Sequence, residues 1–434
     1  MRRDPGVDEL GLQPLTSIVE LVTIGDELLL GFTVDTNGAY LARRLAERGI
    51  AVGRRTAVGD DKLAIAEAVR EALLRTGGVI TTGGLGPTSD DVTRDAVADV
   101  FGRDLRIDAA HLEWMRERWR SRFGRDMPES NRRQAMIPAG ARKLDNRHGS
   151  APGVYIEDER GFVVLLPGVP RELRGMTDDV LLPLLLARGC GSDGDCIRSV
   201  ALRTTGIAES LLQDQLRELA PGDAVRAPSV AYLPGVDGVD LRLTMRGPDA
   251  SREIDRFIET IRAAIPEGIY GTDDMDLAAV LLDMCRTDGL RIAVAESCTG
   301  GLLGARLTAI PGSSDVFVGG VIAYANEVKV KELGVSHVDL GRYGAVSEPV
   351  VRQMALGAQR MFGVPLALAI TGVAGPGGGT PEKPVGLVWV CVALDGQVET
   401  RKLQSWGDRQ EVRYRAAQAA MELARRQLLS RASV

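Results

Sequence analysis

Residues 79–91, VITTGGLGPTSDD, join a short apolar run to a loop that is rich in glycine. Val79–Thr82 has the length and residue types of a buried strand, and the helical pattern Asp90–Phe101 follows the glycines. The same order of strand, glycine-bearing turn and helix begins with the apolar strand Ile18–Ile24 and recurs along the chain. Helices that alternate with short apolar strands predict a mainly parallel α/β sheet.

At 434 residues the chain is too long for one hydrophobic core, so we expect two or three domains. The first α/β domain is predicted over residues 18–174, because the strand Phe162–Leu166 runs into a turn near that point. Residues 175–265 form a predicted small α+β connector, which ends where a proline and a glycine follow. Residues 266–434 again alternate strands with helices and form the predicted second α/β domain, whereas residues 1–17 are a predicted extension.

The overall charge and the cysteine pattern argue against several classes of protein. The net charge of −6 argues against a broad surface for nucleic acid. Five scattered cysteines predict neither a disulfide framework nor a zinc site. No apolar run reaches transmembrane length, and residues 1–17 lack the apolar centre of a secretory signal, so we predict a cytoplasmic protein without a membrane partner.

A second glycine turn, AESCTGG at residues 295–301, follows the predicted strand Arg291–Ala295. Ser297 is expected at the carboxyl end of that strand and near a helix N-terminus, where N–H groups can stabilise an oxyanion or a phosphate. Two alternatives remain open here. Either Ser297 or Thr299 only caps the helix, or the neighbouring Cys298 is the nucleophile.

A serine nucleophile needs a base, and no histidine lies in a glycine-rich motif, so a serine–histidine–aspartate triad is not expected. Residues 324–329, YANEVK, offer a lysine instead. Asn326 can cap the following helix and place Lys329 in its first turn, where the helix dipole lowers the pKa of an ammonium group. Glu327 opposes that shift, and Lys331 points elsewhere around the helix and is the weaker choice. The pattern predicts a serine–lysine dyad.

Two further segments of this domain carry groups that suit a phosphate. Residues 370–379, ITGVAGPGGG, leave the predicted strand Leu366–Ile370, and their glycines allow backbone N–H groups to approach a ligand. Arg409 opens the last helix and Arg413 follows one turn later. Arginines in such positions bind phosphate well, although solvated helix arginines are commoner.

The motifs AESCTGG, YANEVK, AVSE, ITGVAGPGGG and GDR, in this order, resemble the nicotinamide mononucleotide deamidase domain of the CinA family. The resemblance implies that Ser297 attacks the nicotinamide carboxamide, that Lys329 takes its proton and that Tyr324 assists. It implies nicotinic acid mononucleotide and ammonia as products, with no cofactor for this step. The residues that it assigns to substrate binding are Thr299, Gly300, Thr371, Gly372, Gly375 and Arg409.

The first glycine loop feeds a helix N-terminus and is therefore a predicted phosphate cradle. It is not a P-loop, because the GK[ST] ending is missing. The predicted phosphate-binding residues are Gly83, Gly84, Gly86 and Thr88.

Four carboxylates are expected around that loop. Asp26 and Glu27 end a strand of the same layer, and Asp90 and Asp91 close the loop. They would repel a phosphate unless a divalent cation of the Mg, Mn or Co type bridges them, so all four are predicted metal ligands. Asp90 can also simply cap the helix.

Residues 23–29, TIGDELL, and 82–91, TGGLGPTSDD, resemble the molybdopterin-cofactor-biosynthesis fold in the variant found at the N-terminus of CinA proteins. Residues 131–135, 151–153 and 166–172 fit the same variant. The resemblance implies an ADP-ribose pyrophosphatase that needs a divalent cation and releases AMP and ribose 5-phosphate. Because the fold also serves molybdopterin binding, the alternative is a nucleotide- or pterin-binding regulatory protein with only the deamidase active.

The connector resembles a KH-like module, and residues 235–238 have the GXXG spacing. An acid within that motif and the lack of basic neighbours argue against RNA binding. The predicted fold is α/β: a molybdopterin-biosynthesis-like domain and a three-layer deamidase domain, joined by the KH-like α+β connector. The family resemblance also implies a homodimer that recycles pyridine nucleotides without a nucleic-acid partner.

Overall fold

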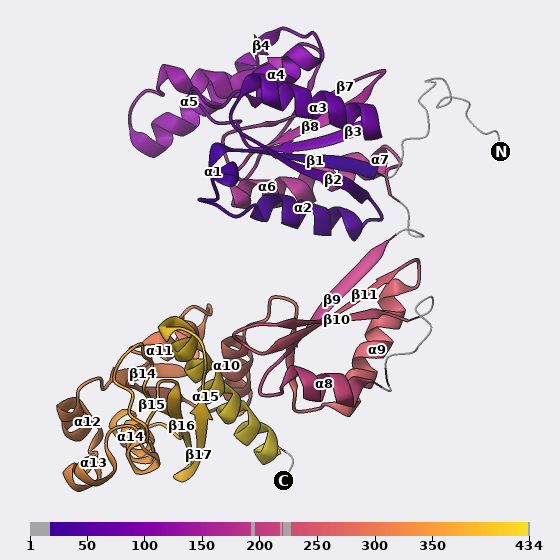
Figure 1. The fold of residues 1–434 in the computed structure, drawn as a ribbon. Coiled ribbons are helices and arrows are strands. Elements are labelled where there is room, and N and C mark those ends of the chain that lie inside the picture. Colours follow the sequence, from indigo (N-terminus) through magenta and orange to yellow (C-terminus); the bar gives the residue numbers. More distant parts are fainter. Residues whose placement is uncertain (1–17, 192–195, 218, 220–226, 433–434) are drawn as a thin grey trace. The chain divides into compact units, whose positions relative to one another are not determined.

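The computed structural model describes residues 18–191, 196–217, 219 and 227–432 (Figure 1). The predicted extension 1–17 lies outside the described residues. The chain divides into two compact units, one up to Arg198 together with Met245–Ser251, the other Ser199–Thr244 together with the chain from Arg252 onward. Each unit is described by itself.

The N-terminal unit is built on a six-stranded sheet of order β2-β1-β3-β8-β7-β6. The first four strands in this order run parallel, and β7 and β6 are antiparallel to their neighbours, so the expected mainly parallel sheet is confirmed. The bounds are β1 Ile18–Ile24, β2 Ala51–Val58, β3 Gly78–Thr82, β6 Arg142–Leu144, β7 Gly153–Asp158 and β8 Gly161–Leu166.

Helices cover both faces of this sheet (Figure 1). One core contains residues of α3 and α4, and the other contains residues of α2, α6 and α7. The helix bounds are α1 Asp26–Leu29, α2 Thr36–Ala46, α3 Lys62–Thr76, α4 Thr93–Val100, α5 Ala109–Phe123, α6 Pro170–Met176 and α7 Leu182–Ala187. A two-stranded sheet, the 3₁₀ helix η1 and the π-helical turn η2 complete the unit: β4 Leu105–Ile107, β5 Met136–Pro138, η1 Glu129–Ala135 and η2 Thr177–Leu181.

The core of the N-terminal unit continues beyond residue 174, where we placed the end of the first domain. Leu173, Met176 and Leu185 are fully buried in the same cluster as residues of β1 and β8. The segment Pro170–Ala187 therefore packs as part of this domain, because its apolar face covers the sheet.

The connector is a four-stranded sheet of order β10-β11-β9-β12 with two helices (Figure 1). Our boundary at residue 266 separates β12 from this sheet, and that part of the prediction is wrong, because β12 pairs with β9 in antiparallel register. The bounds are β9 Ile197–Thr204, α8 Glu209–Leu216, β10 Ser229–Pro234, β11 Val239–Arg246, α9 Ala250–Ala264 and β12 Ile269–Thr272.

The C-terminal domain has a five-stranded sheet of order β14-β13-β15-β16-β17, in which the first three strands are parallel and the last two antiparallel. One core joins the sheet to α10, α11 and α15, and the other joins it to α12 and α14, which gives the three layers that we predicted. The strands are β13 Ile292–Glu296, β14 Phe317–Ile322, β15 Leu366–Gly372, β16 Leu387–Leu394 and β17 Gln397–Gln404. The helices are α10 Leu277–Thr287, α11 Leu302–Thr308, α12 Asn326–Leu333, α13 His337–Tyr343, α14 Glu348–Phe362 and α15 Arg409–Ala432, with the 3₁₀ turn η4 Ser313–Asp315.

The predicted fold class is thus confirmed: two α/β domains and an α+β connector. Within the described ranges, no helix combines the length and the hydropathy that crossing a bilayer requires.

Candidate functional sites

Ser297 directly follows β13, at the edge of the sheet where the parallel strands β13 and β15 both end. Its backbone N–H donates to Ile370 O at 3.0 Å, so the loop is tied to the neighbouring strand. Ser297 is half-buried, and its hydroxyl has no hydrogen-bond partner among the described residues. Its place at the carboxyl end of a strand is the one predicted from the sequence.

Glu296 holds the start of α11, a role that we did not predict. Its side chain is 1% exposed, and its carboxylate accepts three backbone hydrogen bonds, from Gly301, Leu303 and Gly304, at 2.8–3.0 Å. Three of the N–H groups that we expected to be available to an oxyanion or phosphate are therefore satisfied by this carboxylate. The signal in the sequence is an acid that ends a buried strand just before a glycine turn.

The capping alternative for Ser297 and Thr299 is wrong, because the N-cap of α11 is Gly301, with a φ of 95°. Thr299 has two other features. Its carbonyl oxygen accepts from Arg413 Nη2 at 2.6 Å and from Arg413 Nε at 3.2 Å. Its Oγ1 is fully buried and has no partner in the described residues, which is rare for a buried hydroxyl and leaves it available to a ligand.

Lys329 lies in α12 with a side chain that is 1% exposed. Its Nζ donates to Ala323 O at 2.7 Å and to Tyr324 O at 3.1 Å, and among the described residues it makes no hydrogen bond to Ser297. Burial lowers the pKa of Lys329, while the neighbouring Cys298 and Glu327 oppose that shift. The predicted direction is confirmed, but the main cause is burial.

Two details of this region correct the sequence analysis. Asn326 does not cap α12, because the N-cap is Ala325 and makes no side-chain capping bond. Cys298 is 6% exposed, and burial raises the pKa of its thiol to about 12. The Cys298 thiol is also less accessible to a substrate than the half-buried Ser297, so the cysteine alternative is the weaker one on burial.

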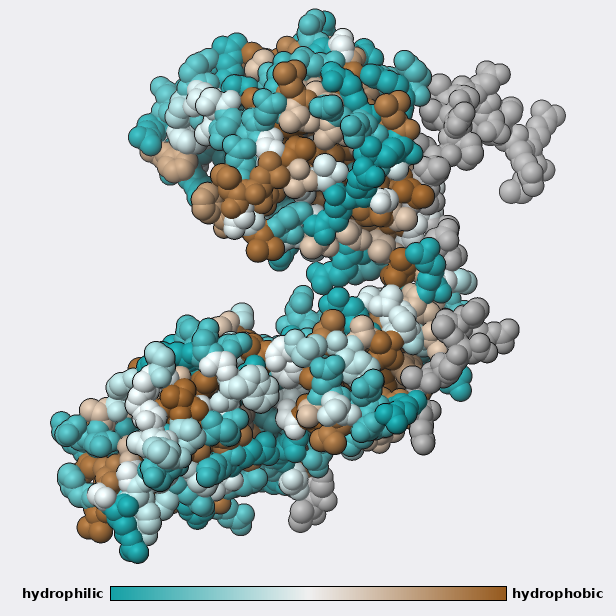
Figure 2. All heavy atoms as spheres, in the orientation of Figure 1, coloured by the Kyte–Doolittle hydropathy of each residue, from teal (hydrophilic) through white to brown (hydrophobic). Residues whose placement is uncertain are grey.

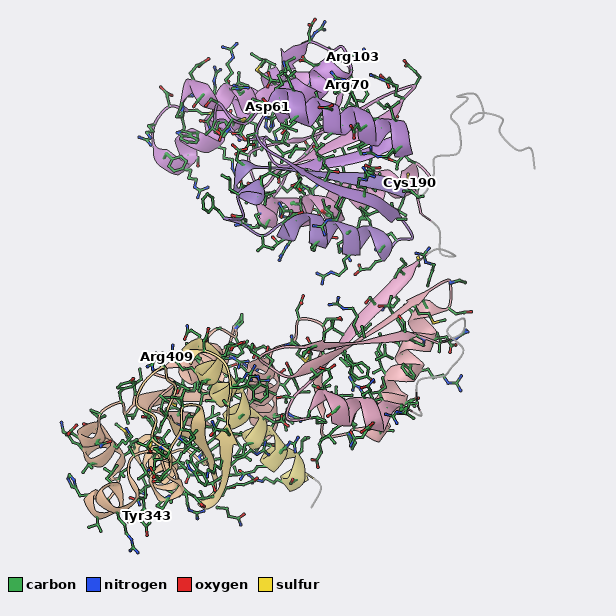
Figure 3. All side chains as sticks on the ribbon, viewed as in Figure 1. Asp61, Arg70, Arg103, Cys190, Tyr343 and Arg409 are labelled. Carbon is green, nitrogen blue, oxygen red and sulfur yellow. The ribbon has the colours of Figure 1, made fainter. Side chains whose placement is uncertain are left out.

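Arg409 connects three segments that are far apart in the sequence. It lies at the start of α15, and Figure 3 labels it at that end of the yellow helix. Its Nη1 donates to Gly375 O at 2.5 Å and its Nη2 to the Tyr324 hydroxyl at 3.1 Å. The structure therefore brings together three of the predicted site residues, with the Tyr324 side chain 60% exposed beside them.

The remaining residues of this domain that we predicted to bind substrate contact other parts of the protein. Thr371 is buried, and its Oγ1 donates to Ala345 O at 2.9 Å. Gly372 is packed against β16, since a Cβ there would lie 2.7 Å from Val388 Cγ2. Gly300 has a φ of 58°, which favours glycine, and faces Arg413.

In the N-terminal unit, a pocket of about 220 Å³ lies where β1, β3 and β8 end. Asn37 joins two sides of this pocket by donating to Gly168 O at 2.6 Å and to Thr82 Oγ1 at 3.4 Å. The pocket lining contains Glu27, one of the predicted metal ligands, and adds Asp35 and Asn37, which we did not predict. The lining residues are Thr23, Ile24, Glu27, Leu28, Thr33, Val34, Asp35, Thr36, Asn37, Thr82, Gly168 and Pro170.

The glycine loop after β3 is closed by Asp91. The Asp91 carboxylate accepts from Gly86 N at 2.6 Å, from Thr88 N at 2.8 Å and from the Thr88 hydroxyl. The Gly86 and Thr88 groups that we predicted to bind a phosphate are thus bonded to a carboxylate of the protein itself. Gly83 and Gly84, with φ values of 108° and 64°, shape the loop.

The helix after this loop begins later than we predicted. Its first residue is Thr93 and its N-cap is Val92, so Asp90 does not cap it. Asp90 is exposed, and the nearby Thr88 hydroxyl lowers the pKa of its carboxyl group. Asp91 also lies before the helix, where its carboxylate is bonded to the loop.

The four predicted metal ligands do not converge on one point. No group of three or more His, Cys, Asp or Glu residues is placed to hold a metal ion within the described part of the chain. Asp26 pairs instead with Asp60, through backbone N–H donors to each other's carboxylates at 2.9 and 3.1 Å. Burial raises the pKa of Asp60, and the charges of Asp26, Glu27 and Asp90 raise it further. Asp60 is therefore a member of this acidic group that we did not predict.

The GXXG motif of the connector closes the turn between β10 and β11. Gly235 N donates to Gly238 O at 2.8 Å, and Asp237 forms an ion pair with Arg203 at 3.0 Å. The acid that we noted in this motif is thus bonded within the connector, and the absence of RNA binding stays a prediction.

Three family descriptions match successive parts of the chain: "Probable molybdopterin binding domain" over residues 20–187, "Damage-inducible protein CinA KH domain" over 199–271 and "CinA C-terminal domain" over 274–428. The chain is 56% identical over 412 residues to a CinA-like protein of Gemmatimonas aurantiaca, a match that covers 94% of this chain and 96% of the relative. It is 40% identical over 414 residues to a CinA-like protein of Kosmotoga olearia, covering 94% and 98%. The crystal structure of competence/damage inducible protein CihA from Agrobacterium tumefaciens is 41% identical, covers 34% of this chain and 90% of its own, and has a TM-score of 0.33.

Together the fold and these matches define a multidomain α/β protein with a molybdopterin-binding-like domain and a KH-type connector. The chain belongs to the CinA family. The family that the motifs indicated is therefore confirmed.

Proposed function

We propose that the C-terminal domain hydrolyses the carboxamide of nicotinamide mononucleotide. The observation that carries this proposal is a lysine with a lowered pKa, Lys329, buried beside the sheet edge that presents Ser297. A buried amine that loses its proton more readily than an ordinary lysine is what a serine nucleophile needs in the absence of histidine.

In this reaction the Ser297 oxygen bonds to the carboxamide carbon while its proton passes to Lys329 Nζ. The C–N bond then breaks, and ammonia leaves with that proton, so the nicotinoyl group remains on Ser297 as an ester. Water cleaves the ester with Lys329 as the base, which releases nicotinic acid mononucleotide and restores the serine. Two backbone carbonyls orient Lys329 Nζ, so one position on the nitrogen is left for proton exchange.

The substrate would be held by the groups that surround these two residues. The unpartnered Thr299 Oγ1 suits a polar atom of the substrate, and the Arg409 guanidinium suits its phosphate. The Tyr324 hydroxyl, which already accepts from Arg409, would position the base or the phosphate. These assignments follow the family resemblance and the contacts among the side chains.

The test is ammonia release from nicotinamide mononucleotide by the full chain without added metal. Ser297→Ala and Lys329→Ala should each lose several orders of magnitude in kcat. Lys331→Ala is the matched control, because Lys331 lies on the same helix with a side chain that is 84% exposed. A folded parent that releases no ammonia, or a Ser297→Ala variant that keeps its rate, would overturn the proposal.

We also propose that the N-terminal unit cleaves ADP-ribose to AMP and ribose 5-phosphate with a divalent cation. The supporting observation is the pocket at the ends of β1, β3 and β8, with the acidic group Asp26, Glu27, Asp60 and Asp90 nearby. The carboxylates as they stand do not form a metal site, so we assign no step to the ion.

The alternative for this unit is binding of a nucleotide or pterin without turnover. Incubation of the protein with ADP-ribose and Mg²⁺, Mn²⁺ or Co²⁺, followed by chromatography for AMP, separates the two possibilities. Release of AMP that falls strongly in Asp60→Asn supports hydrolysis. Saturable binding of ADP-ribose with no AMP under any of the three ions supports the regulatory alternative.

A homodimer in the cytoplasm, without a nucleic-acid partner, remains our proposal for the assembly. An apolar segment of the N-terminal unit suits such an association, since Leu30, Phe32 and Val34 are 67%, 82% and 80% exposed, and hydrophobic atoms gather near α1 in Figure 2. Light scattering should give twice the chain mass, and Phe32→Asp should lower it. Leu74→Asp, at an 85% exposed leucine of α3 outside this segment, is the control. A gel shift with DNA that survives moderate salt would contradict the absence of a nucleic-acid partner.

A further inference from the structure

A second pocket of the N-terminal unit is lined mainly by basic side chains. It has a volume of about 280 Å³ and lies between α5, the loop 148–150 and the start of α6. We name it the arginine pocket. Its lining residues are Arg118, Arg122, His148, Gly149, Ser150, Val169, Arg171 and Glu172.

Three of these residues are arginines whose guanidinium groups have no ion pair or hydrogen bond to any described residue: Arg118, Arg122 and Arg171. Their neighbours on α5 differ. Arg116 pairs with Glu113 at 3.4 Å, and Arg120 pairs with Asp126 at 2.9 Å. The two arginines of α5 that line the pocket, Arg118 and Arg122, therefore lack a carboxylate partner among the described residues, whereas the other two arginines of this helix have one.

The other charged groups of the pocket are already bonded. Glu172, the one acid in the lining, accepts from Asn146 Nδ2 at 2.6 Å. His148 Nε2 lies 2.9 Å from Asp179 Oδ2. Three guanidinium charges thus face a single carboxylate, which makes this a positively charged pocket in a chain whose net charge is −6.

The floor of the pocket is closely packed. Asn146 Nδ2 also donates to Ala151 O at 2.8 Å, and His111 Nε2 contacts Ser150 O at 3.2 Å, so the loop is held from both sides. Gly149 lies directly under Glu172, because a Cβ there would come within 1.9 Å of that carboxylate.

Aromatic rings support the two arginines of α5. The Arg118 guanidinium carbon is 5.3 Å from the Trp114 ring centre, and that of Arg122 is 5.4 Å from the Phe123 ring centre. Such stacking limits the freedom of a guanidinium group and leaves its N–H donors to face a ligand. The two residues are four apart and therefore share one face of the helix.

We propose that the arginine pocket binds the phosphate or pyrophosphate group of a small molecule. Guanidinium groups bind phosphate oxygens through paired charge-assisted hydrogen bonds, and three of them around one cavity match a multiply charged anion. The volume lies just below the usual range for sites that enclose a whole ligand, about 300–1,000 Å³, and so fits an anionic group. The proposal does not depend on hydrolysis of ADP-ribose.

The relation to the first pocket supports a small-molecule ligand. Gly168 and Pro170 line the pocket at the ends of β1 and β3, whereas Val169 and Arg171 line the arginine pocket. The turn that follows β8 therefore borders both. A small molecule in the first pocket therefore lies next to the turn that also carries Arg171.

The test is titration calorimetry of the full chain with inorganic pyrophosphate, in low salt and without divalent cations. The parent should bind it saturably, and the pair Arg118→Gln/Arg122→Gln should weaken binding at least about tenfold through loss of charge-assisted hydrogen bonds. Arg171→Gln alone should weaken it as well. All three positions are exposed, so thermal unfolding of the variants should match the parent.

The pair Arg116→Gln/Arg120→Gln is the control, because it removes the same charge from the same helix outside the pocket. It should leave binding unchanged. The proposal is overturned if the parent shows no saturable binding, if the control pair weakens binding as much as the pocket pair, or if the pocket variants bind as the parent does. Equal affinity for citrate and pyrophosphate would overturn the preference for phosphate. Short single-stranded DNA that competes with pyrophosphate at equal affinity would assign the surface to nucleic acid instead.

Discussion

Two side chains of opposite charge, Glu296 and Lys329, are buried next to the Ser297 turn. One accepts its hydrogen bonds from the backbone, and the other donates its hydrogen bonds to the backbone. Glu296 accepts three backbone N–H groups at the start of α11. Lys329 donates to two backbone carbonyls and, because of burial, has a lowered pKa. Burial away from a carboxylate partner favours the Lys329 amine as the neutral base.

The rate should depend on pH through Lys329. Burial disfavours its ammonium form, so the neutral amine appears at a lower pH than in an ordinary lysine. We expect kcat/KM for deamidation to rise with pH along a limb whose midpoint lies below about 10.4, the ordinary lysine value. Lys329→Arg should remove activity at every pH, since arginine stays protonated. A rising limb at the ordinary lysine value would contradict this explanation.

Glu296→Gln should weaken the turn that carries Ser297. The amide keeps one acceptor oxygen and places an NH₂ group against backbone N–H donors, so at least one bond to a charged acceptor is lost. We expect a loss of about 2 kcal/mol in the stability of the C-terminal unit and a fall in kcat larger than any rise in KM. Denaturant unfolding and steady-state ammonia release measure the two effects.

The control for this substitution is Glu209→Gln, an exposed acid in the first turn of α8. It should change stability by less than about 1 kcal/mol, because only a screened helix-dipole interaction is lost. If Glu296→Gln keeps both the parent's stability and its kcat, Glu296 does not position Ser297.

At the level of elements, α15 connects the candidate site with the connector. Its first turns carry Arg409 and Arg413, which bond to the Gly375 and Thr299 carbonyls. Farther along, Gln418 Nε2 donates to Asp237 O at 3.2 Å, and Arg425 donates to Glu267 O. One helix therefore fixes both the site loops and the connector within the same unit.

The pairing inside α15 should control the stability of this unit. Glu422 is 1% exposed and accepts from Arg425, which is 4% exposed, at 2.7 Å and from Arg426 at 2.6 Å. Glu422→Gln leaves a buried guanidinium without a charged partner, a change that costs about 3–5 kcal/mol. Asp395→Asn, in the exposed pair with Arg431, should cost less than about 1 kcal/mol. Denaturant unfolding followed by circular dichroism measures both, and equal small losses would contradict the prediction.

For the whole molecule, the two proposed activities should be separable, because each lies in its own compact unit. Ser297→Ala should abolish ammonia release and leave AMP formation from ADP-ribose at the parent's rate. Asp60→Asn should have the reverse effect. Both reactions can be followed in one preparation, and loss of both activities in either variant would show that the sites are not independent.

Most of the elements were predictable, and the exceptions have physical reasons. β13 and β15 are short, apolar and buried on both faces, which is a strong local signal. β17 was missed because QVETRKLQ is a polar edge strand whose pairing with β16 supplies its stability. β12 was missed because its four residues follow a proline and pair with β9, which lies far away in the sequence.

The sequence by itself determined the order of strands, glycine turns and helices, the family, and the position of Ser297 at the end of a buried strand. Periodicity and turn chemistry are local properties, so short segments suffice to reveal them. Only the tertiary structure showed that Lys329 is buried and that Asp60 lies close to the other acidic residues. It also showed that Glu296 and Asp91 accept hydrogen bonds from backbone N–H groups that we expected to be free. Burial and the choice of hydrogen-bond partner depend on how distant segments pack, and no local pattern records them.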